Sequence, residues 1–150
     1  MRINTYQIRL NEDRKSELVK ERGINYGEST VVDSPDRAAE ILERVFDLSN
    51  QAQEVVCLLA LDGARRVAGA FEVSRGTLTS SLVHPREIFQ RAILSGAASI
   101  IISHNHPSGA LTLSEQDRAV TKRILDAGDL LGIPLDDHII CAGGSFISAM

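Results

Sequence analysis

The sequence predicts an α/β protein, close to the border with α+β, in which a mixed β-sheet is flanked by helices. Short apolar runs alternate along the chain with segments whose apolar residues recur every three or four positions, a pattern typical of strands followed by helices. An Asp62-Gly63 pair separates two of the apolar runs and predicts an antiparallel hairpin. The apolar run at residues 98–103 follows a strand and a helix, so this crossover predicts parallel pairing elsewhere in the sheet.

Composition sets limits on the class of protein. The chain has 150 residues, of which 43% are hydrophobic and 24% charged, which is ordinary for one globular domain with a real core. No apolar run approaches the length of a membrane span, and residues 1–7 lack the apolar stretch of a signal peptide. We therefore expect a cytoplasmic protein without a membrane partner. Cys57 and Cys141 lie in apolar runs, so we expect buried, reduced thiols.

The charge distribution bears on nucleic-acid binding. The net charge of −4 is spread evenly, with 8 basic and 10 acidic side chains in residues 1–50 and the same numbers in residues 51–150. Non-specific nucleic-acid binding needs a basic face, and neither half of the chain supplies one. A basic patch assembled by the fold stays an open alternative.

The first 33 residues differ from the rest of the chain. Residues 6–10 alternate between apolar and polar side chains, which predicts a short strand. Residues 11–23 are polar and charged, so we expect a solvated loop or a weak helix there. We interpret residues 1–33 as an N-terminal arm and residues 34–150 as the main domain.

Start and stop signals place the remaining elements. Ser34 and Pro35 form a helix start, because serine caps a helix and proline is favoured at the first helical position. Gly96 and Gly132 are helix stop signals. In chain order we expect a helix at 35–48, strands at 54–61, 65–73 and 77–83, a helix at 85–96, a strand at 98–103, a helix at 115–131, and strands at 138–142 and 145–147.

The most informative stretch joins the end of one strand to the start of a helix. Side chains alternate along a strand, so His104 and His106 project to the same side if the extended backbone continues past residue 103. Ser114 is a good N-cap, which places Asp117 at the third helical position. Two imidazoles and one carboxylate can thus converge, and three such ligands plus a water form an open, catalytic type of zinc site.

The same residues have an ordinary interpretation. A His-x-His sequence is common by chance, and Ser-x-x-Asp is a frequent helix start whose acid interacts favourably with the helix dipole. The histidine pair alone therefore does not decide for a metal site.

The arrangement as a whole is more specific. The signature has four parts: His104-x-His106, seven residues that begin with a Pro-Ser-Gly turn, then Ser114, and then Asp117. This arrangement resembles the JAMM signature of the JAB/MPN metallopeptidases. The sequence motif His-Asn-His-Pro-Ser-Gly is similar to that of the bacterial RadC branch of the family, and the resemblance extends over about residues 28–143. Leu113 stands where the family commonly has proline.

This resemblance implies a three-layer, cytidine-deaminase-like fold over residues 34–150 and a zinc ion held by the three ligand candidates. It also implies that Glu54, at the mouth of a strand, is the general acid/base, and that Ser114 donates a hydrogen bond to the oxyanion. Taken alone, a glutamate in the position of Glu54 is most often just solvated. Glu72 on the returning strand is a weaker rival for the same role.

Two further histidines have structural and functional interpretations. His84 precedes Pro85, and we favour a hydrogen-bonded histidine at a helix entry over a metal ligand. Asp136, Asp137 and His138 form a polar cluster that we interpret as a turn before a strand. The functional role open to this cluster is support of the metal ligands.

Three functions from different classes follow from these observations. The first is a zinc metallopeptidase that cleaves a peptide or isopeptide bond in a peptide or protein substrate. The second is a DNA-repair-associated protein that binds or processes DNA, although the helix-hairpin-helix region of longer RadC members is not expected in this chain. The third is a non-catalytic JAB-fold interaction module. An exposed edge strand would also permit a homodimer.

Overall fold

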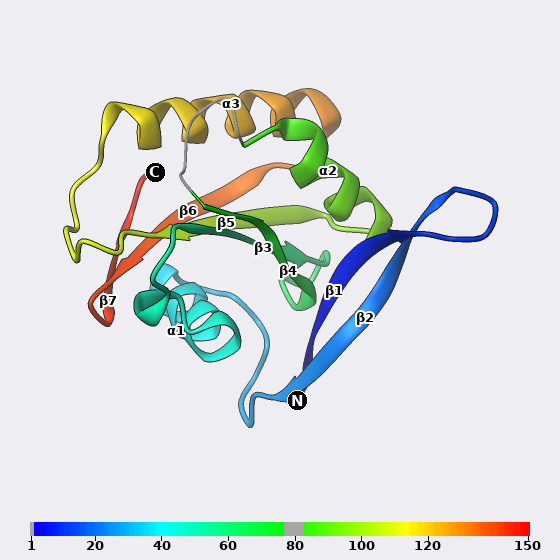
Figure 1. Cartoon of the computed structure of the whole chain (residues 1–150), viewed down its shortest axis with the longest axis horizontal. Helices are drawn as coiled ribbons and strands as arrows, with labels where there is room; N and C mark the ends of the chain where they lie inside the picture. The colour runs from blue at the N-terminus through cyan, green and yellow to red at the C-terminus, as the bar shows by residue number, and fades with distance from the viewer. Residues whose placement is uncertain (1, 77–82) are drawn as a thin grey trace.

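The computed structural model describes residues 2–76 and 83–150, and within them one mixed sheet is flanked by helices (Figure 1). The strands of this sheet are ordered β2-β1-β4-β3-β5-β6-β7. The elements are β1 (Arg2–Leu10), β2 (Ser16–Asn25), α1 (Pro35–Phe46), the 3-10 turn η1 (Leu48–Asn50), β3 (Val55–Leu61), β4 (Val67–Arg75), α2 (Pro85–Leu94), β5 (Ser99–Asn105), α3 (Glu115–Leu131), β6 (Leu135–Ala142) and β7 (Ser145–Ser148).

Strand pairing confirms the predicted mixed sheet. The fold is of the α+β type, and the sequence had predicted an α/β protein close to the border with that class. β3 is antiparallel to both β4 and β5, so the hairpin predicted at Asp62-Gly63 is confirmed. β5 is parallel to β6, and α3 forms the crossover between them. The strand predicted at 77–83 falls almost entirely outside the described residues, and so does the parallel pairing predicted from it.

Helices cover both faces of the sheet, with α2 and α3 on one side and α1 on the other (Figure 1). β3 is buried along its whole length, and its side chains alternate between two apolar cores. Cys57 and Leu59 belong to the core beneath α1, whereas Leu58 and Ala60 belong to the core beneath α2 and α3. A strand that is covered on both faces is apolar at every position, which explains the continuous apolar run of β3. Cys57 and Cys141 are buried free thiols, as predicted.

The predicted cap of α1 is confirmed. The Ser34 hydroxyl accepts a 3.1 Å hydrogen bond from the backbone amide of Arg37, and Pro35 is the first helical residue. The helix ends at Asp47, whose left-handed backbone lets its amide donate to the carbonyl of Glu43. The buried face of α1 is formed by Ala38, Ala39, Ile41, Leu42 and Val45.

The N-terminal residues form a hairpin of two strands, of which β1 is longer than the strand predicted at 6–10. The interpretation of residues 11–23 as a loop or weak helix holds only for residues 11–15 and is wrong from Ser16, where β2 begins and pairs with β1 along its length. β2 is an edge strand whose positions are all exposed or half-buried, so it is held mainly by backbone pairing and its sequence lacks an apolar alternation.

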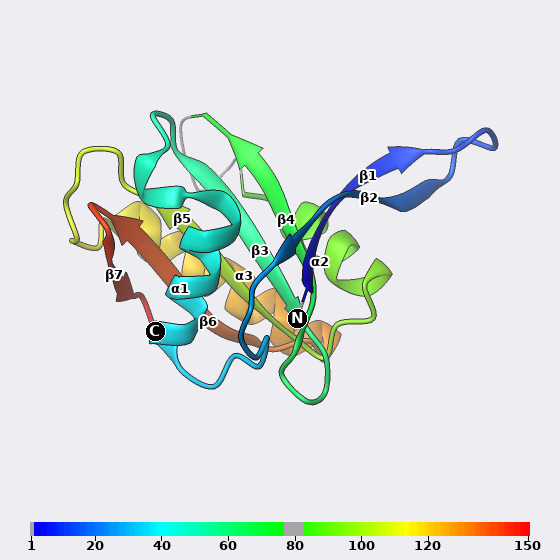
Figure 2. The same ribbon diagram turned by 90° about the horizontal axis from the view of Figure 1, so that it is seen from below.

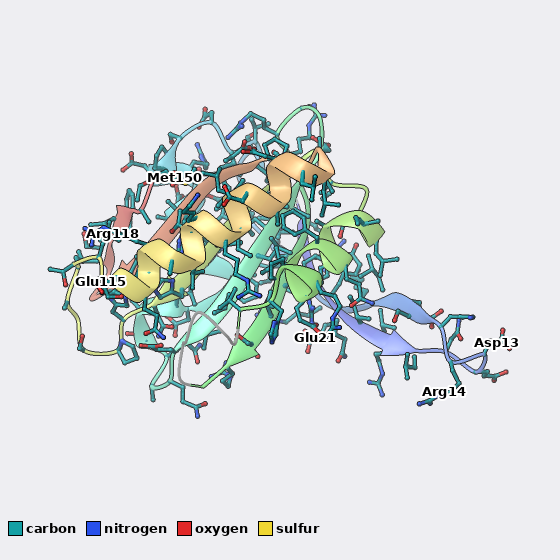
Figure 3. The ribbon with its side chains drawn as sticks, turned by 90° about the horizontal axis from the view of Figure 1, so that it is seen from above. Asp13, Arg14, Glu21, Glu115, Arg118 and Met150 are labelled. Atoms are coloured by element: carbon teal, nitrogen blue, oxygen red, sulfur yellow. The ribbon has the colours of Figure 1, made fainter. Side chains whose placement is uncertain are left out.

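The two ends of this hairpin have different surroundings. Near its base, Thr5 of β1 pairs with Ala70 of β4, and Ile3 is fully buried in the core beneath α1. The far end projects from the body of the molecule (Figure 2), and Figure 3 shows Asp13 and Arg14 at its tip. None of the helices in residues 2–76 and 83–150 is long and apolar enough to cross a membrane.

Candidate metal centre

Two histidines come from the end of β5, a central strand with β3 on one side and β6 on the other. His104 pairs in register with Val56 and Ile140 and is only 1% exposed. Ile100 and Ile102 of the same strand pack beneath α2 and α3, so alternation sends the His104 side chain toward the same helices. His106 follows directly after β5, as the spacing predicted.

The third ligand candidate comes from the first turn of α3. Ser114 and Asp117 form a capping box, in which the Ser114 hydroxyl accepts from the Asp117 amide at 3.0 Å. The Oδ2 atom of Asp117 accepts from the Ser114 amide at 2.8 Å. This arrangement fixes the carboxylate and leaves its Oδ1 atom 2.9 Å from Nε2 of His104. Figure 3 shows the neighbouring Glu115 and Arg118 at this end of the helix.

The ligand atoms of His104, His106 and Asp117 all lie within 4.8 Å of one another. The Nε2 atoms of the two histidines are 3.2 Å apart, and Nε2 of His106 is 3.3 Å from Oδ2 of Asp117. His106 Nδ1 lies 2.8 Å from the carbonyl oxygen of Ala110, which can only accept, so Nδ1 carries a proton. In the neutral ring, Nε2 of His106 therefore presents its lone pair to the cluster.

The electrostatic surroundings of the Asp117 carboxylate favour its charged form, which can bind a cation. Burial raises the pKa of Asp117, but the His104 imidazole and the amide and hydroxyl of Ser114 lower it by more. The net pKa of Asp117 thus lies below its ordinary value of 3.8, and the side chain is an anion at neutral pH. Two imidazole nitrogens and one buried carboxylate oxygen form a donor set that suits a metal ion. This cluster could hold a metal ion, as the sequence predicted.

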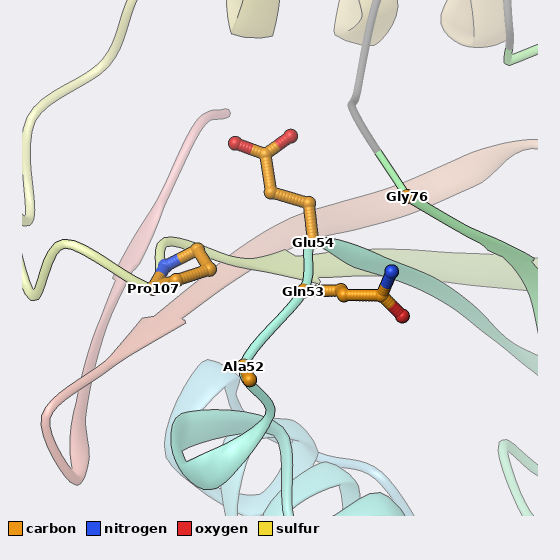
Figure 4. Close-up of a pocket in the computed structure, with 5 residues that line it drawn as sticks. All are labelled: Ala52, Gln53, Glu54, Gly76 and Pro107. Atoms are coloured by element: carbon orange, nitrogen blue, oxygen red, sulfur yellow. The ribbon is translucent and has the colours of Figure 1, made fainter.

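Glu54 lies in the same groove as two of the three ligand candidates. It directly precedes β3, is half-buried, and lines a cavity of about 490 Å³ together with His106, Ser114 and Asp117. Figure 4 shows the Glu54 carboxylate beside Pro107, while Gln53 points away from it. A second cavity, of about 330 Å³, adjoins the first, because Glu54 and Pro107 line both.

Comparison with known proteins agrees with this site. A family model described as RadC-like JAB domain matches residues 32–150, which is most of the chain. This chain belongs to the RadC-like JAB domain family. Its mixed sheet with helices on both faces is consistent with the JAB/MPN fold.

Curated relatives of this RadC-like JAB domain carry names of the UPF0758 type. The UPF0758 protein tlr1707 of Thermosynechococcus vestitus is 46% identical over 122 residues, which cover 81% of this chain and 48% of that protein. A UPF0758 protein of Geotalea uraniireducens is 44% identical over 115 residues, covering 77% of this chain and 50% of the relative. The chain therefore spans about half the length of these curated relatives.

The structure of the RadC-like JAB domain corrects the interpretation of a polar turn before residue 138, because β6 already begins at Leu135 and includes Asp136 and Asp137. His138 lies in this strand, as predicted for residues 138–142, is 1% exposed, and has its Nε2 atom 2.8 Å from Nδ1 of His104. Burial, followed by the neighbouring His104, lowers the pKa of His138 from 6.5 to about 3, so the ring is neutral at pH 7. The sequence left a second role open for Asp136, Asp137 and His138, namely contact with a ligand candidate. His138 makes such a contact, with His104.

Two residues of the site were missed at the sequence level. Thr121 bonds to His138, and its position one helical turn after Asp117 was an available signal, because residues four apart share a helix face. Asn105 is buried between the two ligand histidines, and its side chain holds the segment that precedes β3. No local pattern predicted that contact, since the partners lie about 50 positions away.

Two other candidates lie away from the cluster. Glu72 pairs with Arg75 and lines a different cavity, together with Tyr6 and Arg22, so it does not share the groove of Glu54. His84 is exposed at the N-cap of α2, as expected for a helix entry. Within the described residues its side chain makes no capping hydrogen bond, and it is not part of the metal cluster.

Proposed function

We propose that this protein is a zinc-dependent hydrolase, a metallopeptidase that cleaves a peptide or isopeptide bond in a peptide or protein substrate. One observation carries the proposal. His106 and Asp117 line the groove that Glu54 and Ser114 also line, and their ligand atoms lie within 4.8 Å of that of the buried His104. Two ligand candidates, a candidate base and a candidate hydrogen-bond donor thus share a single concave surface, with the third ligand candidate directly beneath it.

The donor set favours zinc in an open coordination. Three protein ligands of the nitrogen and oxygen type are characteristic of catalytic zinc sites, whereas structural sites use four. When bound here, zinc would lower the pKa of a water molecule toward about 7 and would polarise the substrate carbonyl.

Glu54 would then act as the general base and general acid. Its carboxylate would accept a proton from the attacking water and deliver it to the nitrogen of the leaving amine. An amide nitrogen is a poor leaving group until it is protonated, so a carboxylate on the substrate side of the ligands is needed. The position of Glu54 supports this role, because it precedes β3 and lines the same groove as Ser114 and Asp117 at the N-terminus of α3.

Ser114 would stabilise the negative charge that develops on the carbonyl oxygen of the substrate. In the capping box its hydroxyl oxygen accepts a hydrogen bond from the Asp117 amide. A hydroxyl can accept and donate at the same time, so the capping bond does not use the hydroxyl proton, which would turn from the Asp117 carboxylate to the oxyanion. The structural and the proposed catalytic roles of Ser114 are therefore compatible.

Metal content tests the first half of the proposal. Protein purified without a metal-binding tag would be offered zinc, desalted and measured by elemental mass spectrometry. We expect about one zinc per chain in the wild type and in Glu54→Gln, and little zinc in His106→Ala and Asp117→Ala. Wild-type protein without stoichiometric zinc would overturn the zinc assignment.

Hydrolysis tests the second half. Zinc-loaded wild type and Glu54→Gln would be compared on a panel of quenched fluorescent peptides and isopeptide-linked conjugates. We expect turnover by the wild type and a loss of about 10²–10⁴-fold in Glu54→Gln at equal zinc content. Zinc binding without hydrolysis of any probe would favour the non-catalytic interaction module. DNA affinity that falls steeply with salt would instead favour the DNA-associated function, which the net charge of −4 does not support.

A further inference from the structure

We propose that His138 and Thr121 form a positioning pair that sets the tautomer of His104 and thereby aims its Nε2 lone pair at the metal position. This inference rests on the proposed metal site and adds two residues to it. Thr121 comes from α3, and His138 comes from β6, the strand that pairs with β5 and contacts α3. Neither is a ligand candidate itself.

A continuous chain of short contacts links the three side chains. Nδ1 of His104 is 2.8 Å from Nε2 of His138. Nδ1 of His138 is 2.6 Å from the Thr121 hydroxyl, which donates a 2.9 Å hydrogen bond to the backbone carbonyl of Asp117. Every nitrogen of the His138 ring therefore has one defined neighbour.

The direction of each hydrogen bond follows from the last link. A carbonyl oxygen can only accept, so the single hydroxyl proton of Thr121 points at Asp117. The Thr121 oxygen must then accept from His138, which places the proton of the neutral His138 ring on Nδ1. Nε2 of His138 is left as an acceptor, so Nδ1 of His104 donates to it. In a neutral His104 ring the lone pair is consequently on Nε2, which faces Asp117 Oδ1 at 2.9 Å.

This series of hydrogen bonds begins and ends at Asp117. The backbone carbonyl of Asp117 accepts the hydrogen bond from the Thr121 hydroxyl. The carboxylate of Asp117 faces Nε2 of His104, the nitrogen whose lone pair is set by this series of hydrogen bonds. Two atoms with lone pairs cannot rest 2.9 Å apart without a positive charge between them, either a proton or a metal ion. The positioning pair therefore prepares the cluster for a cation.

Burial makes the pair necessary. His104, Thr121 and His138 are all buried, so water does not readily replace a missing acceptor. The backbone of His138 is also fixed, because its amide donates to Oδ1 of Asp137 at 2.8 Å, and the same oxygen accepts from Ser148 of β7. Histidine ligands generally need such a partner at the second nitrogen to hold their orientation and tautomer.

Nitrogen NMR of the metal-free protein tests the tautomers without metal or substrate. Long-range correlation spectra of protein labelled at the histidine ring nitrogens would be recorded near neutral pH. We expect His138 to carry its proton on Nδ1 only, and His104 to be protonated on Nδ1. A proton on Nε2 of His138 would overturn the proposal. This readout also stands if the chain proves not to bind zinc, so it separates failure of the positioning pair from failure of the proposed function.

Zinc affinity, measured by competition with a chromophoric chelator, tests the consequence. We expect Thr121→Val and His138→Leu to weaken zinc binding by about 10–100-fold, since loss of an outer partner typically costs that much. His138→Gln keeps an acceptor near the Nε2 position and should lose less affinity, and Thr121→Ser should bind like the wild type. Thr5→Val removes a buried hydroxyl near β4, outside the cluster, and serves as the matched control. Wild-type affinity in both Thr121→Val and His138→Gln would overturn the proposal, even if His138→Leu fails to fold.

Discussion

The side-chain oxygen of Asn105 accepts a 2.7 Å hydrogen bond from the backbone amide of Val55. The amide nitrogen of the same side chain donates to the carbonyl of Gln53 at 2.9 Å. These two partners lie directly before and directly after Glu54. Alternation along β5 sends Asn105 to the face opposite the neighbouring ligand histidines. One buried residue between the ligands thus holds the backbone on both sides of the candidate base.

We therefore expect Asn105→Ala to be strongly destabilising. The substitution leaves the buried amide of Val55 and the carbonyl of Gln53 without their partner, and the free energy of unfolding should fall by ~2–4 kcal/mol. Zinc content should stay near that of the wild type, because the three ligands remain. Urea unfolding and elemental analysis measure the two effects.

Asn50 offers the matched control for that experiment. Its side chain makes an exposed hydrogen bond to Asp47, so Asn50→Ala should change the stability by less than ~0.5 kcal/mol. Equal effects of the two substitutions would contradict the anchoring role of Asn105.

Two substitutions of Asp117 should separate its capping role from its ligand role. Asp117→Asn keeps an oxygen that can accept from the Ser114 amide, whereas Asp117→Ala removes it. In metal-free protein we expect Asp117→Ala to be less stable than Asp117→Asn by ~1 kcal/mol, the usual contribution of a helix cap. Both should bind zinc much more weakly than the wild type. Thermal unfolding with and without zinc gives both quantities, and a strong zinc-induced rise in Tm in either variant would exclude Asp117 as a ligand.

The pKa of His138 predicts a pH dependence of stability in the metal-free protein. Its pKa is about 3 in the folded state and 6.5 when unperturbed, so between these values only the unfolded chain takes up the proton. Stability should thus fall as the pH falls below about 6.5, by up to ~1.4 kcal/mol per pH unit from this group.

Comparison with His138→Gln isolates that contribution. Urea unfolding would be followed in chelator between about pH 7 and 4.5, above the range where the lowered pKa of Asp117 contributes. The stability of the wild type relative to His138→Gln should decline as the pH falls. A difference that does not change with pH would show that His138 does not titrate as the burial implies.

At Gly128 in α3, helix propensity and steric clash have opposite effects on a substitution by alanine. Alanine normally stabilises a helix by ~1 kcal/mol relative to glycine. A Cβ atom at position 128, however, would lie 2.5 Å from the carbonyl oxygen of Ile133 and 3.3 Å from the ring of Phe89. Because the closer atom belongs to the backbone, we expect Gly128→Ala to lower the free energy of unfolding by ~1–3 kcal/mol.

Gly63 in the turn between β3 and β4 is the control for Gly128→Ala. A Cβ atom added at Gly63 has no heavy atom within 4 Å among the described residues, so Gly63→Ala should be close to neutral in chemical denaturation. A Gly128→Ala protein more stable than the wild type would mean that the α3–β6 connection relaxes at little cost.

The sequence alone predicted the ligand cluster because its parts are local. His104, His106 and Asp117 belong to one strand–turn–helix unit, and two short-range rules relate them, alternation along a strand and the geometry of a helix cap. The hairpin of β3 and β4 and the start of α1 were predicted for the same reason. Turn and capping residues act on backbone a few positions away.

The tertiary structure alone decided what surrounds the ligands. The partner of His138 was not predicted, because a polar residue at a strand start has the same local pattern whether it faces water or a buried histidine. Asn105 and His138 find their partners only through the order β3-β5-β6, which joins segments tens of residues apart. β2 was missed because an edge strand is held by backbone pairing and needs no apolar alternation. Local patterns thus predicted which side chains form the cluster, and long-range strand pairing decided which residues contact them.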